Sequence, residues 1–424
     1  MLITSADSDS LLSKKTELLL MNKYPKKKTY KVAFVVQRYG LEINGGAELL
    51  CRDVAEHLSK YCDVDVITTC AIDYVTWKNE YDAGETRINN VLVKRFPVDF
   101  PRDIKRFNKC SEKVLCKDHS IDEEIEWMKL QGPYSTKLFK FIEDNKDHYD
   151  LFFFFTYLYC TTFFGLPLVA NKAILVPAAH DEPPVYLSIF NEMFHKPRAI
   201  MYNTKEEKDF VIQRFHNENI PYDVAGSGVS LPEGLSSVKS LNITNKENFI
   251  TYMGRIDESK GCGELFDFFQ RYKEENNSSI KLLVLGKAVM KVPTHPDIVY
   301  LGFVSEEEKY NTLKESKILL MPSKYESLSI VLLEAWLCKK PVLVNGQCEV
   351  LKGQCIRSNA GLWYENYEEF RECLDLLLAD EHLRDQLGNR GRKFVDMNYS
   401  WENIEKKYLD LMEKVAIDKI QNCQ

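Results

Sequence analysis

The sequence predicts an α/β protein with two Rossmann-like, doubly wound domains that face a cleft, followed by C-terminal helices. Three observations lead to this prediction. The chain has 424 residues, and because a typical domain has roughly 150, more than one domain is expected. Short β-branched runs alternate with amphipathic segments, as in a parallel sheet covered by helices. This alternation begins near Tyr30 and begins again near Phe249, which indicates two units.

Composition and charge exclude several classes of protein. Hydrophobic residues make up 45% and charged residues 28% of the chain, which fits a globular protein. The 56 basic and 63 acidic residues give a net charge of −7, so nucleic acid is not an expected partner. The twelve cysteines are scattered and form no C-x-x-C pair. We therefore expect a reducing, cytoplasmic location.

Residues 1–29 show no periodicity and end in the basic stretch KYPKKK. We expect an N-terminal extension whose charges are solvated, with contact to a membrane surface as the alternative.

The first domain is expected over residues 30–225. It opens with the strand YKVAFVV, a glycine-containing loop, the helix GAELLCRDVAEHLSKY and the strand VDVITT, which form a β-α-β unit. The uncharged segment 151–170 is long enough to span a membrane. Its threonines, glycine and proline instead favour a buried strand and a short helix. Further strand-like runs are Val91–Phe96, Leu151–Phe155, Ala173–Val176 and Ala199–Tyr202.

The second domain is expected over residues 226–400, joined to the first within residues 221–247. It opens with the strand FITYMG, the loop RIDESKG, the helix GELFDFFQRY and the strand IKLLVLG. Strands IVYLG, KILLMP and PVLV then alternate with helices at residues 305–315 and 328–338. The tail from Glu368 predicts several helices, the last over residues 401–424.

The segment YESLSIVLLEAW carries two glutamates with seven residues between them. Glu334 interrupts an apolar helix, where a carboxylate needs a partner, either a ligand hydroxyl or a salt bridge. Glu326 precedes that helix, where free N–H groups and the helix dipole favour an anion such as phosphate. The alternative for Glu326 is an exposed carboxylate near a helix start.

Two cations lie in the loop GRIDESKG, at the carboxyl edge of the second predicted sheet, where open α/β sheets bind ligands. Arg255 and Lys260 would neutralise a diphosphate there, and the alternative is a surface turn with solvated cations. In the first domain, Gly45 and Gly46 open a helix, so the backbone either approaches a ligand or forms an ordinary turn. His180 follows a strand end on the cleft side, with a structural histidine as the alternative.

Metal ligands are not expected. Asp63-Val64-Asp65 matches the D-x-D pattern of metal-dependent transferases, but it precedes a strand, which favours a turn and a strand start. No convincing set of histidine and cysteine ligands accompanies it.

Together these residues resemble the retaining nucleotide-sugar glycosyltransferases of family 4, which have the GT-B fold. The shared features are GGAE after the first strand, HD after a first-domain strand, GR-x4-KG opening the second domain, and E-x7-E in YESLSIVLLEAW. They follow the family's order across roughly residues 30–400. One departure is that Ser327 and Ser329 stand where the family often has glycine.

The resemblance implies an acceptor-binding first domain and a second domain that binds a nucleoside-diphosphate sugar with uridine or guanosine as the nucleoside. It implies that Arg255 and Lys260 hold the diphosphate. Glu326 would contact sugar hydroxyls, Glu334 would contact the ribose, and His180 would lie beside the transferring sugar. The further positions implied to line the donor or acceptor are Gly45, Gly46, Gly254, Phe303, Val304, Ser327, Leu328 and Ser329.

The implied reaction is sugar transfer to an acceptor hydroxyl with retention of the anomeric configuration, by front-face attack. Arg255 and Lys260 would stabilise the departing diphosphate in place of a metal, so neither a metal nor a cofactor is expected. The acceptor would be a glycan or a lipid-linked or protein-linked group. The basic, aromatic stretch 102–109 is expected to form a solvated helix, with contact to a lipid-linked acceptor or an anionic surface at the inner membrane face as the alternative.

Two other readings remain open on the residues alone. One is another GT-B sugar enzyme, such as a phosphorylase or a nucleotide-sugar epimerase. The other is a non-catalytic protein that binds nucleotide sugars or glycans.

Overall fold

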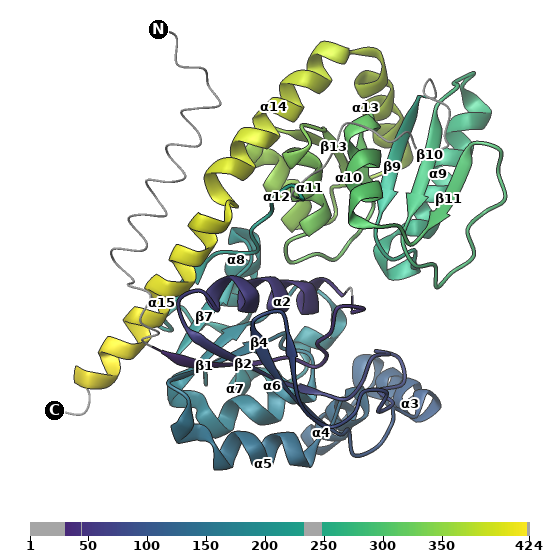
Figure 1. Cartoon of the computed structure of the whole chain (residues 1–424). Helices are drawn as coiled ribbons and strands as arrows, with labels where there is room; N and C mark the ends of the chain where they lie inside the picture. The colour runs from purple at the N-terminus through teal and green to yellow at the C-terminus, as the bar shows by residue number, and fades with distance from the viewer. Residues whose placement is uncertain (1–29, 44, 233–247, 422–424) are drawn as a thin grey trace, which may run out of the picture. The chain divides into compact units, whose positions relative to one another are not determined.

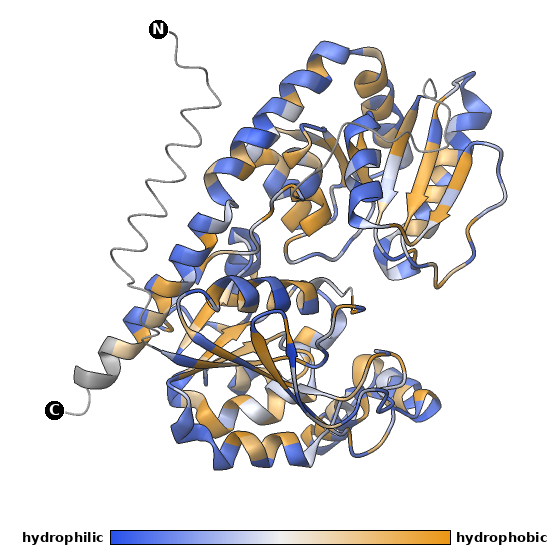
Figure 2. Cartoon of the chain, in the orientation of Figure 1, coloured by the Kyte–Doolittle hydropathy of each residue, from blue (hydrophilic) through white to orange (hydrophobic). Residues whose placement is uncertain are grey.

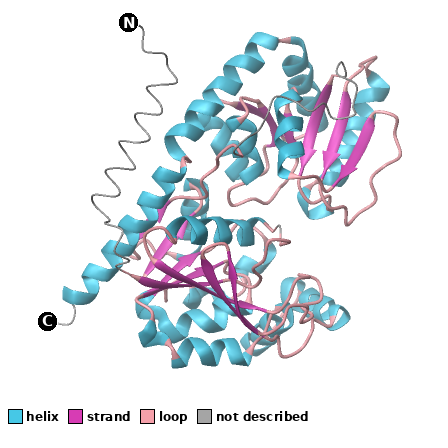
Figure 3. Cartoon of the chain, viewed as in Figure 1, coloured by secondary structure: helices cyan, strands magenta, loops and turns pink. Residues whose placement is uncertain are grey.

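The computed structural model describes residues 30–43, 45–232 and 248–421, and the expected N-terminal extension lies outside them. The described residues form two compact units (Figure 1). The first contains residues 30–227 and 401–421, and the second contains residues 228–400. Each unit has a mainly parallel sheet with helices packed on it (Figure 3), which confirms the predicted α/β class.

The first unit contains an eight-stranded sheet in the order β3-β4-β2-β1-β5-β6-β7-β8. Only the pair β3 and β4 is antiparallel. The four strand-like runs expected after the β-α-β unit are confirmed as β4 to β7. The strands are β1 (Lys31–Val35), β2 (Asp63–Thr69), β3 (Gly84–Ile88), β4 (Val91–Phe96), β5 (Leu151–Phe155), β6 (Ala173–Val176), β7 (Ala199–Tyr202) and β8 (Tyr222–Val224).

The segment 151–170 forms strand β5 and a short helix, as expected. Among the described residues, no helix is long and apolar enough to cross a membrane. The helices of the first unit are α2 (Gly46–Leu58), α3 (Ile104–Cys116), α4 (Ile121–Gln131), α5 (Thr136–Asp144), η1 (Lys146–His148), α6 (Cys160–Gly165), η2 (Leu166–Lys172), η3 (Pro183–Tyr186), α7 (Ile189–Met193), α8 (Lys205–Phe215) and α15 (Trp401–Gln421).

Strand β5 shows how the sheet is buried on both faces. Phe152 and Phe154 join the core cluster that includes side chains of α4, α5 and α7. Phe153 points the other way and contacts Phe34 of β1 and Tyr408 of α15. Figure 1 shows α2 on one side of this sheet and α5, α6 and α7 on the other, and Figure 2 shows the strands as mainly hydrophobic. A strand covered on both faces needs a continuous apolar run, which explains the sequence LFFFF.

Helix α15 follows the second unit in the chain but packs in the first, against α2, β7 and β8. The ring of His57 stacks on Trp401 with centroids 3.5 Å apart. Glu405 accepts hydrogen bonds from Tyr61 and Lys60, each at 2.9 Å. Burial acts to raise the pKa of Glu405, but its bonds to His57 and Lys60 hold it below the ordinary value. Helix α15 therefore completes the first unit.

The second unit contains a six-stranded parallel sheet in the order β11-β10-β9-β12-β13-β14. The strand order reverses between β9 and β12, so their carboxyl ends flank a topological switch point. The strands are β9 (Phe249–Met253), β10 (Lys281–Leu285), β11 (Ile298–Gly302), β12 (Leu319–Met321), β13 (Val342–Asn345) and β14 (Gly361–Tyr364). The helices are η4 (Glu258–Lys260), α9 (Cys262–Glu275), α10 (Glu306–Glu315), α11 (Ile330–Leu337), α12 (Glu349–Ser358), α13 (Tyr367–Ala379) and α14 (Glu381–Asn398).

Candidate active site

The loop after β9 and the loop after β12 meet at the switch point of the second sheet. Lys260 Nζ lies 2.7 Å from Glu326 Oε1, which joins the two loops by an ion pair. Gly261 has φ +72°, and a Cβ there would lie 2.2 Å from the carbonyl oxygen of Pro322. A side chain at Gly261 would force the loops apart, so this glycine permits the contact between Lys260 and Glu326.

The other cation of the β9 loop also has an acidic partner. Arg255 Nε lies 3.0 Å from Asp257 Oδ2, and Asp257 accepts the backbone N–H of Ser259 at 2.8 Å. Burial acts to raise the pKa of Asp257, but the bonds from Ser259 and Arg255 hold it below the ordinary value. Gly254 has φ +149°, in the region that favours glycine. The loop therefore offers two cations, each held by a carboxylate.

The start of α11 keeps a backbone conformation that glycine prefers. Ser329 immediately precedes the helix with φ +64° and is 9% exposed. A non-glycine residue in this left-handed region loses about 1 kcal/mol or more. Leu328 is buried and its carbonyl accepts Gln354 Nε2 at 2.6 Å, while Ser327 is half-buried. Ser329 thus adopts a left-handed conformation that glycine would adopt at lower cost.

Glu334 lies in the second turn of α11 and is 5% exposed. Its Oε1 lies 2.7 Å from Lys309 Nζ and 3.3 Å from the Tyr310 hydroxyl, both on α10. Its Oε2 is buried and has no hydrogen-bond partner among the described residues. The salt bridge expected as one alternative is present, and the second carboxylate oxygen stays without a partner among the described residues.

Lys309 also forms an ion pair with a second carboxylate, since its Nζ lies 2.7 Å from Glu306 Oε2. Burial acts to lower the pKa of Lys309, but the attraction of Glu334 and Glu306 raises it above the ordinary value. Burial also raises the pKa of Glu334, against the opposing attraction of Lys309. Lys309 is a residue that the sequence analysis did not identify, since its partner lies on another helix.

Phe303 and Val304 follow β11 directly after Gly302, which has φ +72°. The side chain of Phe303 is 69% exposed and Val304 is half-buried. The exposed ring is available to a flat partner such as a nucleoside base.

The GGAE segment of the first unit begins α2. A Cβ at Gly46 would meet no described atom within 4 Å, whereas one at Gly45 would lie 2.1 Å from Glu48 Oε2. Glu48 is buried and accepts Arg38 Nε at 2.8 Å, which fixes the loop after β1 to the start of α2. The backbone at Gly46 is therefore open to close approach, and Glu48 has a structural partner.

His180 follows β6 in a turn that includes Ala178 at φ +49°. Its Nδ1 lies 3.6 Å from Glu182 Oε1. The adjacent N–H of Ala179 donates to Glu207 Oε1 at 2.7 Å. Burial raises the pKa of Glu207 to about 8, against backbone N–H donors that act to lower it. Glu207 thus anchors the His180 turn from α8, which the sequence analysis missed because no local pattern marks it.

Asp63 and Asp65 of the D-x-D segment lie in β2, as the strand prediction required. Asp65 accepts the hydroxyl of Tyr149 at 2.8 Å. Among the described residues, no group of three or more histidine, cysteine, aspartate or glutamate side chains is placed to hold a metal ion. The structure brings Arg255, Lys260, Glu326 and the α11 residues into one unit, while His180, Gly45 and Gly46 belong to the other.

Residues 236–394 match the family model described as "Glycosyl transferases group 1". An uncharacterized glycosyltransferase of Methanocaldococcus jannaschii, MJ1607, is 24% identical, and the alignment covers 92% of this chain and 99% of that protein. The capsular polysaccharide biosynthesis glycosyltransferase CapM of Staphylococcus aureus is also 24% identical, over 50% of this chain and 58% of its own length.

Solved structures are similar across nearly the whole chain. Sucrose-phosphate synthase of Thermosynechococcus elongatus gives a TM-score of 0.67 at 15% identity, covering 91% of this chain and 99% of that one. The HepE protein of Anabaena, solved with UDP and glucose, gives 0.64 at 13% identity, covering 91% and 100%. At these identities the structures establish the fold, and the family match and relatives establish the class of enzyme. The chain is therefore a glycosyltransferase with the GT-B fold, and its residues 236–394 resemble the group 1 glycosyltransferases, in agreement with the resemblance to family 4.

Proposed function

We propose that this enzyme transfers a sugar from a nucleoside-diphosphate sugar to an acceptor hydroxyl and retains the anomeric configuration. The observation that carries the proposal is the ion pair of Lys260 and Glu326, which joins two motif loops at the switch point of the second sheet. Ligands of open α/β sheets bind at such a point. The similar HepE structure holds UDP, which favours a UDP-sugar as the first donor to test, ahead of a GDP-sugar.

Arg255 and Lys260 are suited to bind the donor diphosphate. Their side chains are 36% and 32% exposed, so a ligand can reach them. A phosphate would attract Lys260 away from Glu326, and the released carboxylate could then accept a sugar hydroxyl. The ion pair of the donor-free site would thus be exchanged for two contacts to different parts of the donor.

The remaining residues are proposed to contact other parts of the donor. The unpartnered Oε2 of Glu334 is proposed to accept a ribose hydroxyl, and Phe303 and Val304 to contact the base. Gly254, Ser327, Leu328 and Ser329 would form the backbone around the diphosphate and sugar. In the first unit, Gly45 and Gly46 are proposed to approach the phosphate or the acceptor.

Departure of the nucleoside diphosphate is the step that these residues would accelerate. Negative charge develops on the leaving oxygen, and the two cations would stabilise it once the bound donor has drawn Lys260 to the diphosphate. The acceptor would attack from the same face, with His180 beside the transferring sugar. We accordingly propose turnover without a divalent metal or cofactor. The described cysteines are free thiols, which fits the proposed cytoplasmic site of action.

Thermal shift with a panel of nucleoside diphosphates and nucleotide sugars tests the donor site. A ligand at 100 times its dissociation constant should stabilise the protein by ~2.7 kcal/mol. Lys260→Ala should reduce this stabilisation, because it deletes a charge-assisted contact to phosphate.

Lys352→Ala is the matched control, since Lys352 forms a comparable 2.9 Å ion pair with Glu365 outside the two loops. It should respond to the panel as the wild type does. No shift with any nucleotide in the wild type, or equal loss in both variants, would contradict the site.

A further inference from the structure

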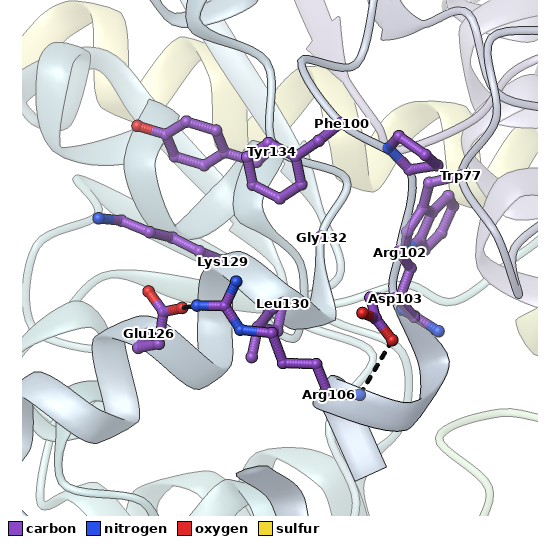
Figure 4. Close-up of a pocket in the computed structure, with 11 residues that line it drawn as sticks. Trp77, Phe100, Arg102, Asp103, Arg106, Glu126, Lys129, Leu130, Gly132 and Tyr134 are labelled. Carbon is purple, nitrogen blue, oxygen red and sulfur yellow. Dashed lines mark hydrogen bonds and ion pairs between the residues drawn. The ribbon is translucent and has the colours of Figure 1, made fainter. Parts of the chain in front are cut away.

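The first unit contains a pocket of about 400 Å³ that is lined in part by the basic stretch 102–109. We call it the basic pocket, and its principal lining side chains are Trp77, Phe100, Arg102, Arg106, Lys129 and Tyr134 (Figure 4). Its volume lies at the lower end of the roughly 300–1,000 Å³ typical of small-molecule sites.

The basic pocket lies where ligands of α/β sheets are expected. Trp77 belongs to the segment after β2, and Phe100 and Arg102 belong to the segment after β4. Strands β2 and β4 are parallel neighbours, so these segments leave the same carboxyl edge of the sheet.

The lining residue Trp77 also lies near the partner of the GGAE segment, Arg38. The guanidinium of Arg38 lies 5.9 Å from the ring centre of Trp77, and Arg38 is held by Glu48 of GGAE. The guanidinium of Arg102 lies 5.1 Å from the same ring. Trp77 therefore connects the basic pocket to the GGAE segment through Arg38.

The pocket lining has more cationic side chains than carboxylates, and each of the two carboxylates already has a polar contact within the protein. Glu126 forms an ion pair with Arg106, and Asp103 Oδ1 accepts the backbone N–H of Arg106 at 3.0 Å. Arg102 donates to neutral oxygens, among them the carbonyl of Tyr74 at 3.2 Å. Lys129 forms no ion pair among the described residues.

The charge of Arg102 and Lys129 is therefore available to an anion. Burial lowers the pKa of Arg102 from its ordinary value, as expected for a cation without a carboxylate partner. A phosphate would supply that partner, because it accepts hydrogen bonds from several donors at once.

Aromatic rings form the other side of the pocket. Phe100 is 42% exposed, and its ring stacks on Tyr134 with centroids 5.9 Å apart. Lys129 Nζ lies 6.0 Å from the centre of the Tyr134 ring. An apolar platform next to a cation suits a molecule with both an apolar sugar face and a charged group.

We propose that the basic pocket binds a phosphate group carried by the sugar acceptor. The inference rests on the proposed function, because it requires that the enzyme transfers sugar to an acceptor. The phosphate could belong to a soluble sugar phosphate or to a lipid-linked acceptor. Both sources present the same group to Arg102 and Lys129.

Isothermal titration of the full chain tests the proposal. The probes are hexose 1-phosphates and 6-phosphates, each with its unphosphorylated hexose, and undecaprenyl phosphate in neutral detergent micelles. At least one phosphorylated probe should bind ~10-fold more tightly than its neutral counterpart, since a charge-assisted contact is involved. If only the sugar phosphates bind, or only undecaprenyl phosphate in micelles binds, that result identifies the source of the phosphate. Either result supports the proposal.

Lys129→Gln should abolish that preference. Lys105→Gln is the matched control, because Lys105 is an exposed lysine of the adjacent helix α3 outside the pocket lining. Both variants should bind UDP as the wild type does, because both substitutions lie in the first unit. UDP binding thus tests the proposed function separately from the basic pocket.

Several results would overturn the proposal. These are equal affinity for every phosphorylated and neutral probe, no binding of any probe, or an unchanged preference in Lys129→Gln. Vesicles of phosphatidylglycerol provide a further arm. If they bind the protein and the two variants weaken that binding equally while sugar-phosphate binding stays unaffected, the charge serves a membrane surface and not an acceptor phosphate.

Discussion

The two glutamates of the second unit should affect different parts of the donor. Glu326→Gln keeps the size of the side chain and removes its charge, so Lys260 loses its 2.7 Å partner. Affinity for the nucleoside diphosphate should then stay the same or rise, because Lys260 is freed for phosphate. Affinity for the nucleotide sugar should fall, because a hydroxyl contact is lost. Glu334→Gln should weaken both ligands alike, since both contain the ribose.

The size of the effect follows from the type of contact. A hydrogen bond to a charged group contributes ~1.5–3 kcal/mol, which corresponds to about 10–150-fold in dissociation constant. In the Glu326 variant, the affinity for the nucleotide sugar should fall by this factor relative to the affinity for the nucleoside diphosphate. The Glu334 variant should show it for both ligands against the wild type.

Effects on folding can be separated from effects on binding. The pair of Lys260 and Glu326 is partly exposed, with side chains 32% and 13% accessible, so its loss should change stability by no more than ~1 kcal/mol. Lys309 keeps Glu306 as a partner in Glu334→Gln. That variant should therefore lose less than the ~3–5 kcal/mol of a buried pair broken outright.

Calorimetric titration of each variant with the diphosphate and with the nucleotide sugar measures both factors. Urea unfolding shows whether the variants are folded. Glu365→Gln, which removes the partner of Lys352, is the matched control and should leave both affinities unchanged. Equal losses for both ligands in the Glu326 variant would refute the division of roles, and would mean that Glu326 positions Lys260.

His180→Ala should lower kcat more than donor affinity, and the product should retain the donor's anomeric configuration by nuclear magnetic resonance; an inverted product would contradict the mechanism. Turnover should persist in excess chelator, whereas complete loss restored by magnesium or manganese would contradict the role of the two cations. Ser329→Gly should raise the unfolding free energy in urea by about 0.5–1 kcal/mol by relieving the left-handed serine; a decrease would contradict the strain. The pKa of Glu207 rises from 4.5 to about 8 on folding, so its contribution to stability should fall as pH rises through that interval; Glu207→Gln should flatten the decline, and an unchanged slope would contradict it.

The sequence predicted the buried strands because two covered faces demand unbroken apolar runs, as in β5. It missed β3 and β8, which lie at the two edges of the first sheet. Strand β3 has the sequence GETRI with four exposed residues, and β8 has only three residues. Such strands are fixed by pairing with a neighbour, and no apolar period marks them.

The candidate site was predictable where a motif lies on one loop and unpredictable where partners come from separate elements. Lys260 and Glu326 were both identified, but their pairing depends on the strand order around the switch point. Lys309 lies 25 residues from Glu334, and Glu207 lies 28 residues from Ala179. Only the tertiary fold brings these residues together, so their spacing in the sequence carries no signal.

Helix α15 belongs to the first unit but follows the second unit in the chain. A single cut in the chain therefore cannot separate the two units into complete fragments. The α15 side chains Tyr408, Leu409 and Met412 are 3% exposed or less, although they follow the whole second unit in the chain. A fragment that stops before the second unit would leave the surface of α2, β7 and β8 without its helix. Co-expression of residues 401–421 as a separate peptide should therefore restore the solubility of this fragment.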